Sequence, residues 1–167
     1  MYQQIRQAFK KPNKEVLRER MTQWRNSESI VKVERPLNIA KARALGYKAK
    51  KGVIIVRVKL RRGGHKRPRP NKGRRSKRMH IRKTLSMNYR EIAEQRAERK
   101  FKNLTALNSY KTGKDVMNYF FEVIMIDSQM PEIKSDKQLS FVVKAINKKR
   151  ALRGLTSAGK KARGLRN

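Results

Sequence analysis

The sequence predicts an α+β fold, in which helices pack on a small mixed or antiparallel sheet. Three observations carry this prediction. Residues 53–60, 104–110 and 119–126 have the β-branched and apolar patterning of strands. Apolar residues recur at helical spacing before and between these strands. The eight residues between the last two strands include Gly113 and Asp115, which indicates a hairpin. A chain that mixes helices with hairpin-linked strands is typical of an α+β sandwich.

Two helices are expected at the N-terminus, within residues 1–27. Tyr2, Ile5 and Phe9 recur at helical spacing, and Pro12 ends the pattern. Asn13 can cap a second helix, because its side chain can accept a hydrogen bond from a free amide of the first turn. One face of this second helix is apolar, through Val16, Leu17, Met21 and Trp24.

The expected core has the order β-α-β-α-β-β. Residues 30–33 are a short β-branched run, residues 37–45 a short helix ended by Gly46, and residues 53–60 a strand with apolar even positions. A further helix runs from near Met87 to about Lys100. Strand 119–126 is apolar on both faces except at Glu122, so a central place in the sheet is expected. We expect one domain over residues 1–147, with an extended basic loop at 61–83, and a basic extension over 148–167, where Thr156 or Ser157 can cap a last helical turn.

The helix near residues 89–100 has two different faces. Its apolar arc is opposite three glutamates, Glu91, Glu94 and Glu98. These glutamates resemble a carboxylate site only superficially. On a basic protein they indicate a solvated helix face, or a docking face for another basic protein.

Positive charge dominates the chain but is unevenly placed. The 167 residues include 46 Lys and Arg against 12 Asp and Glu, a formal net charge of +34. Residues 35–90 hold 21 basic and no acidic residues, and residues 137–167 hold 10 and none. Residues 91–136 are nearly neutral, with 7 basic and 8 acidic residues. Such charge implies a polyanionic partner, and its segregation argues against a uniformly disordered polycation.

Residues 61–83 form a segment of unusual composition. They contain 12 Lys and Arg, three Gly, two Pro and very few apolar side chains. This composition cannot bury enough apolar surface to offset its ordering entropy, so we expect an extended loop that is disordered in the free protein. Arginine dominates it, and the planar guanidinium both matches phosphate oxygens and stacks on bases. Alternatively, this composition indicates a low-complexity cationic linker without a specific binding role.

Several kinds of chemistry have no basis in the sequence. There is no Cys, and the two His (His65 and His80) lie in the basic loop without a nearby carboxylate, so they are read as residues that contact RNA. No phosphate-binding glycine motif occurs. We expect no enzyme activity, no cofactor and no bound metal. The few aromatic residues lie mostly in core-like segments, so stacking platforms for single strands are not expected either.

Longer motifs make the chain resemble a known family. They are ERPLNIAKARALGYKAKKGVIIVRVKLRRGG (34–64), RPRPNKGRRSKRM (67–79), EIAEQRAERKFKNLTALNSY (91–110), FEVIMID (121–127) and RGLTSAGKKARGL (153–165). With them, nearly the whole chain resembles the archaeal and eukaryotic "fifteen-e" family of large-subunit ribosomal proteins, in a form closer to the archaeal branch. The sequence departs from the family's pattern at His80, Lys111, 128–131 and Phe141.

The resemblance implies a structural constituent of the large ribosomal subunit, cytoplasmic and ribosome-bound, that stabilises folded ribosomal RNA beside neighbouring ribosomal proteins. The residues expected to contact RNA are basic or polar and lie in three stretches. They are Arg35, Lys41, Arg43, Lys48, Lys50, Lys51, Arg61, Arg62, His65, Lys66, Arg67, Arg69, Asn71, Lys72, Arg74, Arg75, Lys77, Arg78, Arg82, Lys83, Lys148, Lys149, Arg150, Arg153, Lys160, Lys161, Arg163 and Arg166.

Other functions remain open from the residues alone. A DNA-compacting, chromatin-type protein is the main alternative, although the Pro- and Gly-punctuated loop is unlike a groove-reading helix. A membrane-active protein needs an apolar face opposite its basic residues, and the basic stretches are poor in apolar residues. No run of about 18 apolar residues occurs, so no membrane-spanning helix is expected. An RNA-modifying enzyme lacks a catalytic constellation.

Overall fold

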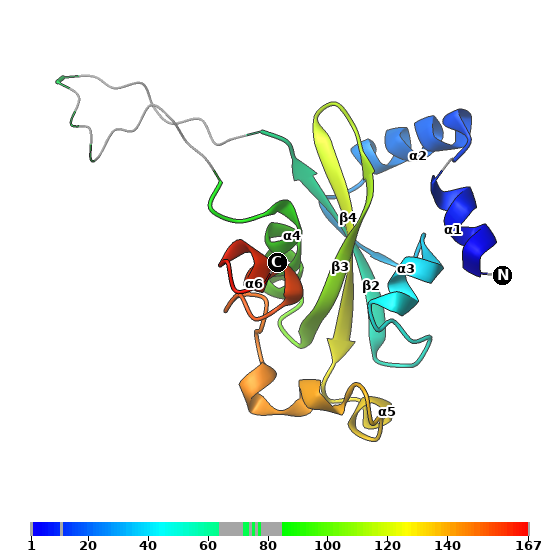
Figure 1. Ribbon diagram of the computed structural model, residues 1–167, viewed down its shortest axis with the longest axis vertical. Coiled ribbons are helices and arrows are strands. Elements are labelled where there is room, and N and C mark those ends of the chain that lie inside the picture. The colour runs from blue at the N-terminus through cyan, green and yellow to red at the C-terminus, as the bar shows by residue number, and fades with distance from the viewer. Residues whose placement is uncertain are drawn as a thin grey trace.

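The computed structural model describes residues 2–10, 12–63, 72, 73, 75, 77 and 85–166 (Figure 1). Its elements are α1 (Tyr2–Lys10), α2 (Lys14–Asn26), β1 (Ile30–Val33), α3 (Ile39–Ala44), β2 (Val53–Arg61), α4 (Tyr89–Lys100), β3 (Leu104–Lys114), β4 (Asn118–Asp127), α5 (Pro131–Lys134), the 3₁₀ turns η1 (Ser140–Val143) and η2 (Ala145–Asn147), and α6 (Ser157–Ala162). The expected α+β class and the order β-α-β-α-β-β are confirmed.

The strands form one four-stranded antiparallel sheet in the order β1-β2-β4-β3. Strand β4 lies between β2 and β3, as its apolar faces predict. The hairpin from β3 to β4 is also confirmed. The pairing register of β3 with β4 shifts at two places, between Ala106 and Asn108 and between Lys111 and Gly113. Such bulges increase the local twist of a strand.

Helix α4 covers one face of the sheet, and α6 lies beside α4 on the same side (Figure 1). Ala93 and Ala97 of α4 are fully buried against Val56, Val58 and Val123. Small alanine side chains allow α4 to lie close to the strands. The core on this side also includes Ala151, which belongs to the predicted basic extension. The division of the chain at residue 148 stays a prediction, but part of that extension packs into the core.

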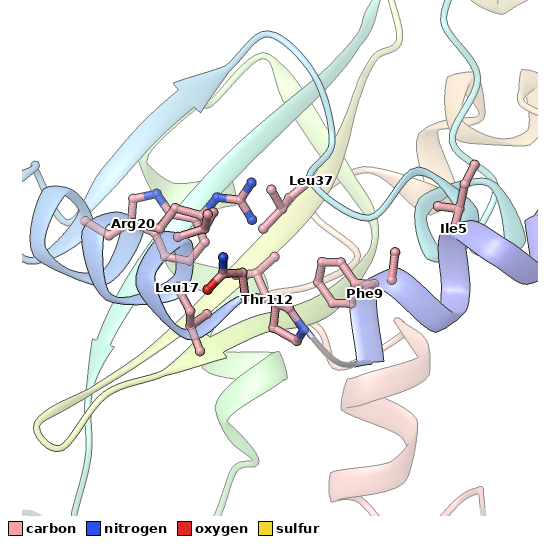
Figure 2. A pocket seen from close by; sticks show the side chains of 11 residues that line it. Ile5, Phe9, Leu17, Arg20, Leu37 and Thr112 are labelled. Carbon is pink, nitrogen blue, oxygen red and sulfur yellow. The ribbon is translucent and has the colours of Figure 1, made fainter.

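The N-terminal helices lie on the other side of the sheet (Figure 1). Trp24 of α2 packs on Phe120 of β4, with 5.2 Å between the ring centroids. Helix α1, in contrast, has no buried residue. Between α1, α2 and the sheet remains an apolar hollow of about 380 Å³, and Figure 2 shows Ile5, Phe9, Leu17, Arg20, Leu37 and Thr112 around it.

The helix boundaries follow from capping residues. Asn13, Asn38 and Asn88 each accept a backbone N–H bond in the first turn of α2, α3 and α4, at 2.8 to 3.0 Å. Of the two predicted candidates, Thr156 and Ser157, it is Thr156 that caps α6 in the same way. Gly46 follows α3 with a positive φ of 97°, a conformation that glycine adopts without strain.

Candidate nucleic-acid interface

The structure describes part of the set expected to bind RNA. The residues of this set that lie outside the described ranges are His65, Lys66, Arg67, Arg69, Asn71, Arg74, Arg78, Arg82 and Lys83. Most of the described ones are exposed: Arg35, Lys41, Arg43, Lys50, Lys51, Arg61, Arg62, Lys72, Arg75, Lys77, Lys148, Lys149, Arg153, Lys160, Lys161, Arg163 and Arg166. Lys48 and Arg150 are half-buried. Most of the described cations of the predicted set are therefore accessible to a polyanion.

Aromatic rings and cations meet where β2 leads into the basic loop. The Arg62 guanidinium lies 5.0 Å from the Tyr119 ring centroid, and the Lys111 ammonium lies 4.3 Å from it. Arg62 also donates to the carbonyl oxygen of Asp115 at 3.0 Å. Tyr89 packs on Tyr119 with 4.8 Å between centroids, and its hydroxyl accepts from the Gly63 amide at 3.0 Å. These contacts fix the strand end from which the loop departs.

Lys48 and Lys50 are held in place by one carboxylate. Both Lys48 and Lys50 bond Asp136, at 3.0 and 2.7 Å. Hydrogen bonds from Lys50 and Lys48 hold the pKa of Asp136 well below its usual range. The segment after α3 is thereby tied to the turn that follows α5.

The glutamates of α4 are not a solvated or docking face; that prediction is wrong. Glu91, Glu94 and Glu98 are 4%, 0% and 4% exposed. The C-terminal segment, residues 148–166, covers them. Sequence periodicity cannot reveal this covering, because the segment that covers α4 lies about 50 residues away in the chain.

Glu98 joins three parts of the chain. Its Oε1 accepts from the Ala106 amide at 3.2 Å, and its Oε2 accepts from the Ala151 and Leu152 amides at 3.1 and 3.2 Å. Burial raises the pKa of Glu98, and these hydrogen bonds together with Arg150 offset part of the rise. The carboxylate thus holds the start of the C-terminal segment against α4 and β3.

Glu94 holds the next part of that segment. Its two oxygens accept from the Ser109 and Thr156 hydroxyls, each at 2.5 Å. Burial also raises the pKa of Glu94, with the two hydroxyls lowering it in part. A Cβ atom on Gly159 would lie 2.6 Å from the Cα atom of Gly154, so a glycine at 159 lets α6 approach the preceding turn closely.

Two arginines of the C-terminal segment, the half-buried Arg150 and the exposed Arg153, contact other parts of this chain. Arg150 lies near Glu94 and Glu98, its guanidinium 5.4 Å from the Phe141 ring centroid, and burial lowers its pKa. Arg153 donates to the carbonyl oxygens of Ile146 and Lys148, the latter at 2.9 Å. Both side chains therefore have partners within this chain, and Arg150 has less of its surface accessible to a polyanion than Arg153.

Glu122 is a further buried carboxylate that joins separate segments of the chain, on the opposite side of the sheet from α4. It is 1% exposed and accepts from the Tyr110 hydroxyl and, at 3.0 Å, from the Leu37 amide. Burial raises the pKa of Glu122, and hydrogen bonds from Tyr110 and Leu37 lower it in part. Glu122 therefore anchors the turn that leads into α3.

Sequence reasoning missed several residues beside the predicted set. Tyr89, Arg90 and Tyr119 lie close to the exposed cations of α6 or of the loop, but none belongs to a basic run. Lys111 appeared only as a departure from the family's pattern. An aromatic residue at a helix start beside a basic loop is the one signal that points to Tyr89.

The described ranges contain neither a metal-binding cluster nor a membrane-spanning helix. Within them, no group of three or more His, Asp or Glu side chains is placed to hold a metal ion. None of the helices described there has the length and apolar composition needed to cross a bilayer.

Comparison with known proteins gives a consistent result. The family model of the ribosomal L15e proteins, described as Ribosomal L15, matches residues 1–167. The protein "Large ribosomal subunit protein eL15" from the archaeon Methanocella arvoryzae is 46% identical over 170 residues, which cover 99% of this chain and 87% of the relative. The archaeal-like resemblance of the motifs is confirmed, and the chain belongs to the ribosomal L15e family.

Proposed function

We propose that the exposed cations of the basic loop, of the segment after α3 and of the C-terminal segment bind folded ribosomal RNA, beside neighbouring ribosomal proteins. As a member of the L15e family, the chain is a structural constituent of the large ribosomal subunit. The proposal adds the surfaces that make the contact and a non-catalytic role: the protein stabilises RNA and helps its assembly.

The observation that supports this proposal is that several carboxylates are buried while most of the basic side chains of the predicted set are exposed. Glu91, Glu94, Glu98, Glu122 and Asp136 are all buried and accept bonds from this chain itself. The side chains of the predicted set remain mostly exposed. Because five of the twelve acidic side chains are buried, the surface carries a larger excess of positive charge, and phosphates supply the matching negative charge.

Sedimentation of cell extract in moderate and high salt tests this proposal. We expect the protein to sediment with the large subunit at moderate salt, and to leave it only when salt screens many phosphate contacts. A protein that stays at the top of the gradient at moderate salt contradicts the proposal.

A triple variant tests the loop. Replacing Arg74, Arg75 and Arg78 by Gln is expected to weaken binding to ribosomal RNA and to lower the salt slope by about 2 to 3, because each phosphate contact contributes roughly one. The unfolding temperature of the free protein should barely change. A large loss of stability would mean that these residues belong to the core.

The DNA-compacting alternative makes a different prediction. It requires comparable affinity for duplex DNA and for ribosomal RNA at matched salt, together with co-fractionation with the nucleoid. Family membership gives it no support.

A further inference from the structure

A second hollow of the molecule differs in chemistry from the apolar one in Figure 2. It has a volume of about 580 Å³ and lies between the N-terminal end of α4, strand β4 and α6. This volume is in the usual range for small-ligand pockets. The residues that line it and carry its chemistry are Tyr89, Arg90, Phe121, Ser157, Lys161 and Arg166.

One side of the pocket is positively charged. Lys161 and Arg166 are exposed, and Arg166 donates to the Ser157 hydroxyl at 2.7 Å. Arg90 is held by the side-chain oxygen of Asn108 at 2.8 Å and by the carbonyl oxygen of Ser109 at 2.6 Å. None of the described lining residues carries a carboxylate, so the two exposed cations, Lys161 and Arg166, meet no competing anion in the pocket wall.

The other side of the pocket is aromatic. Tyr89 is half-buried and packs on Tyr119, whereas Phe121, whose ring centroid lies 6.3 Å from that of Tyr119, is buried in the core. The neighbour Tyr119 fixes the Tyr89 ring. The half-buried Tyr89 ring is therefore the aromatic surface that the pocket offers to a nucleobase.

Hydrogen bonds fix the two helices that enclose the pocket. Asn88 caps α4 and donates from Nδ2 to the Ala158 carbonyl of α6 at 2.9 Å. Thr156, which caps α6, donates to Glu94 of α4 at 2.5 Å. The pocket is therefore preformed, and a ligand that enters it spends little free energy on ordering the protein.

We infer that this pocket binds one unstacked nucleotide of RNA, with the base against Tyr89 and the phosphate at Lys161 and Arg166. This inference rests on the proposed function and adds a site of defined chemistry to it. A paired, stacked base hides its faces, so the nucleotide comes from a bulge, loop or strand end. The sequence predicted no stacking platform, and the structure brings these rings together only through pairing of distant segments.

The first test titrates the free, full-length protein with adenosine 5′-monophosphate and follows backbone amide shifts by NMR. Shifts are expected at Ser157, Ala158 and Lys161. The double variant Lys161→Gln/Arg166→Gln should lose about tenfold in affinity, whereas the charge-matched control Lys137→Gln/Lys144→Gln, at exposed lysines outside the predicted RNA-binding set, should not. All four side chains are exposed, so neither variant should unfold the protein.

Substitutions of Tyr89 test the aromatic wall. Tyr89→Leu is expected to weaken nucleotide binding about tenfold, the scale of one stacked base, whereas Tyr89→Phe retains the ring and the affinity. Inorganic phosphate that binds as tightly as the nucleotide would overturn the inference, since the base would then contribute nothing. Tighter binding of an acidic peptide, or shifts spread evenly over the basic surface, would overturn it as well.

The second test uses assembled large subunits. Ultraviolet crosslinking and mass spectrometry should find nucleotide adducts on the tryptic peptide 84–90, whose only aromatic residue is Tyr89. Adducts elsewhere on the chain with none on this peptide would contradict the pocket and leave the proposed function intact. Failure of the protein to sediment with the subunit would contradict the proposed function itself.

Discussion

The N-terminal helix α1 and the C-terminal segment 148–166 are both basic, yet they are attached to the sheet in different ways. Helix α1 has a regular apolar face, but Ile5 and Phe9 are only half-buried and none of its residues is buried. The C-terminal segment has little apolar patterning, yet Ala151 and Thr156 are fully buried.

The difference shows what holds a basic segment to this fold. An apolar stripe predicts a helix, but α1 closes only one side of an open hollow (Figure 2). The C-terminal segment is held by buried carboxylates of α4 that accept its amides and hydroxyls. A buried acceptor leaves its donors unpaired when it is removed, so such contacts are costly to break. Polar anchoring here outweighs apolar patterning.

The largest effect is expected from Glu98→Ala. It leaves the buried Ala106 and Ala151 amides and the Leu152 amide without their acceptor, which should lower the free energy of unfolding by at least about 3 kcal/mol. Urea denaturation measures the change. Glu28→Ala is the matched control, because its exposed pair with Lys100 should contribute less than about 1 kcal/mol. Equal losses in the two variants would contradict polar anchoring.

A smaller effect is expected from Thr156→Ala. The substitution removes both the cap of α6 and a donor to Glu94, and should cost about 1 to 2 kcal/mol of unfolding free energy. Thr156→Ser keeps the hydroxyl and should restore most of the loss. If the serine variant is as unstable as the alanine variant, the hydroxyl is not the anchor.

Phe9→Ala measures the other side of the comparison. Because Phe9 is half-buried beside a hollow, we expect a loss of about 1 kcal/mol, well below that of a fully buried aromatic residue. Thermal unfolding of the full chain would show it. A loss as large as that of Glu98→Ala would mean that α1 is as firmly attached as the C-terminal segment.

The smallest effect at neutral pH is expected from Asp136→Asn, because both partner lysines are partly exposed. The folded-state pKa of Asp136 lies below its unfolded value. Its contribution to stability is therefore complete above about pH 4 and is lost as the pH falls through the folded pKa. The stability difference between wild type and variant should shrink as pH falls below 4, and a difference that grows there would contradict the pairing.

The sequence predicts the framework of this fold well. Strand β4 has apolar residues on both faces, and that pattern places it centrally. Asn13 caps a helix as expected, and of the two candidates Thr156 and Ser157 it is Thr156 that caps α6. The glutamates of α4 were misjudged, because polar residues at helical spacing look the same whether water or another segment covers them. The pocket between α4, β4 and α6 can be predicted only in part for the same reason. A basic run in the sequence points to Lys161, whereas Tyr89 lies beside Lys161 only because α4 and α6 pack together in the fold.

Hydrogen exchange of the free, full-length protein tests the central claim most directly, namely that buried carboxylates order the C-terminal segment before RNA binds. We predict that the Ala151 and Leu152 amides, which donate to Glu98, exchange as slowly as amides within α4. In Glu98→Gln, exchange of these two amides should accelerate more than exchange in the β2–β4 ladder. Rapid exchange of both amides in the wild-type protein, at the rate of an unstructured peptide, would contradict the account.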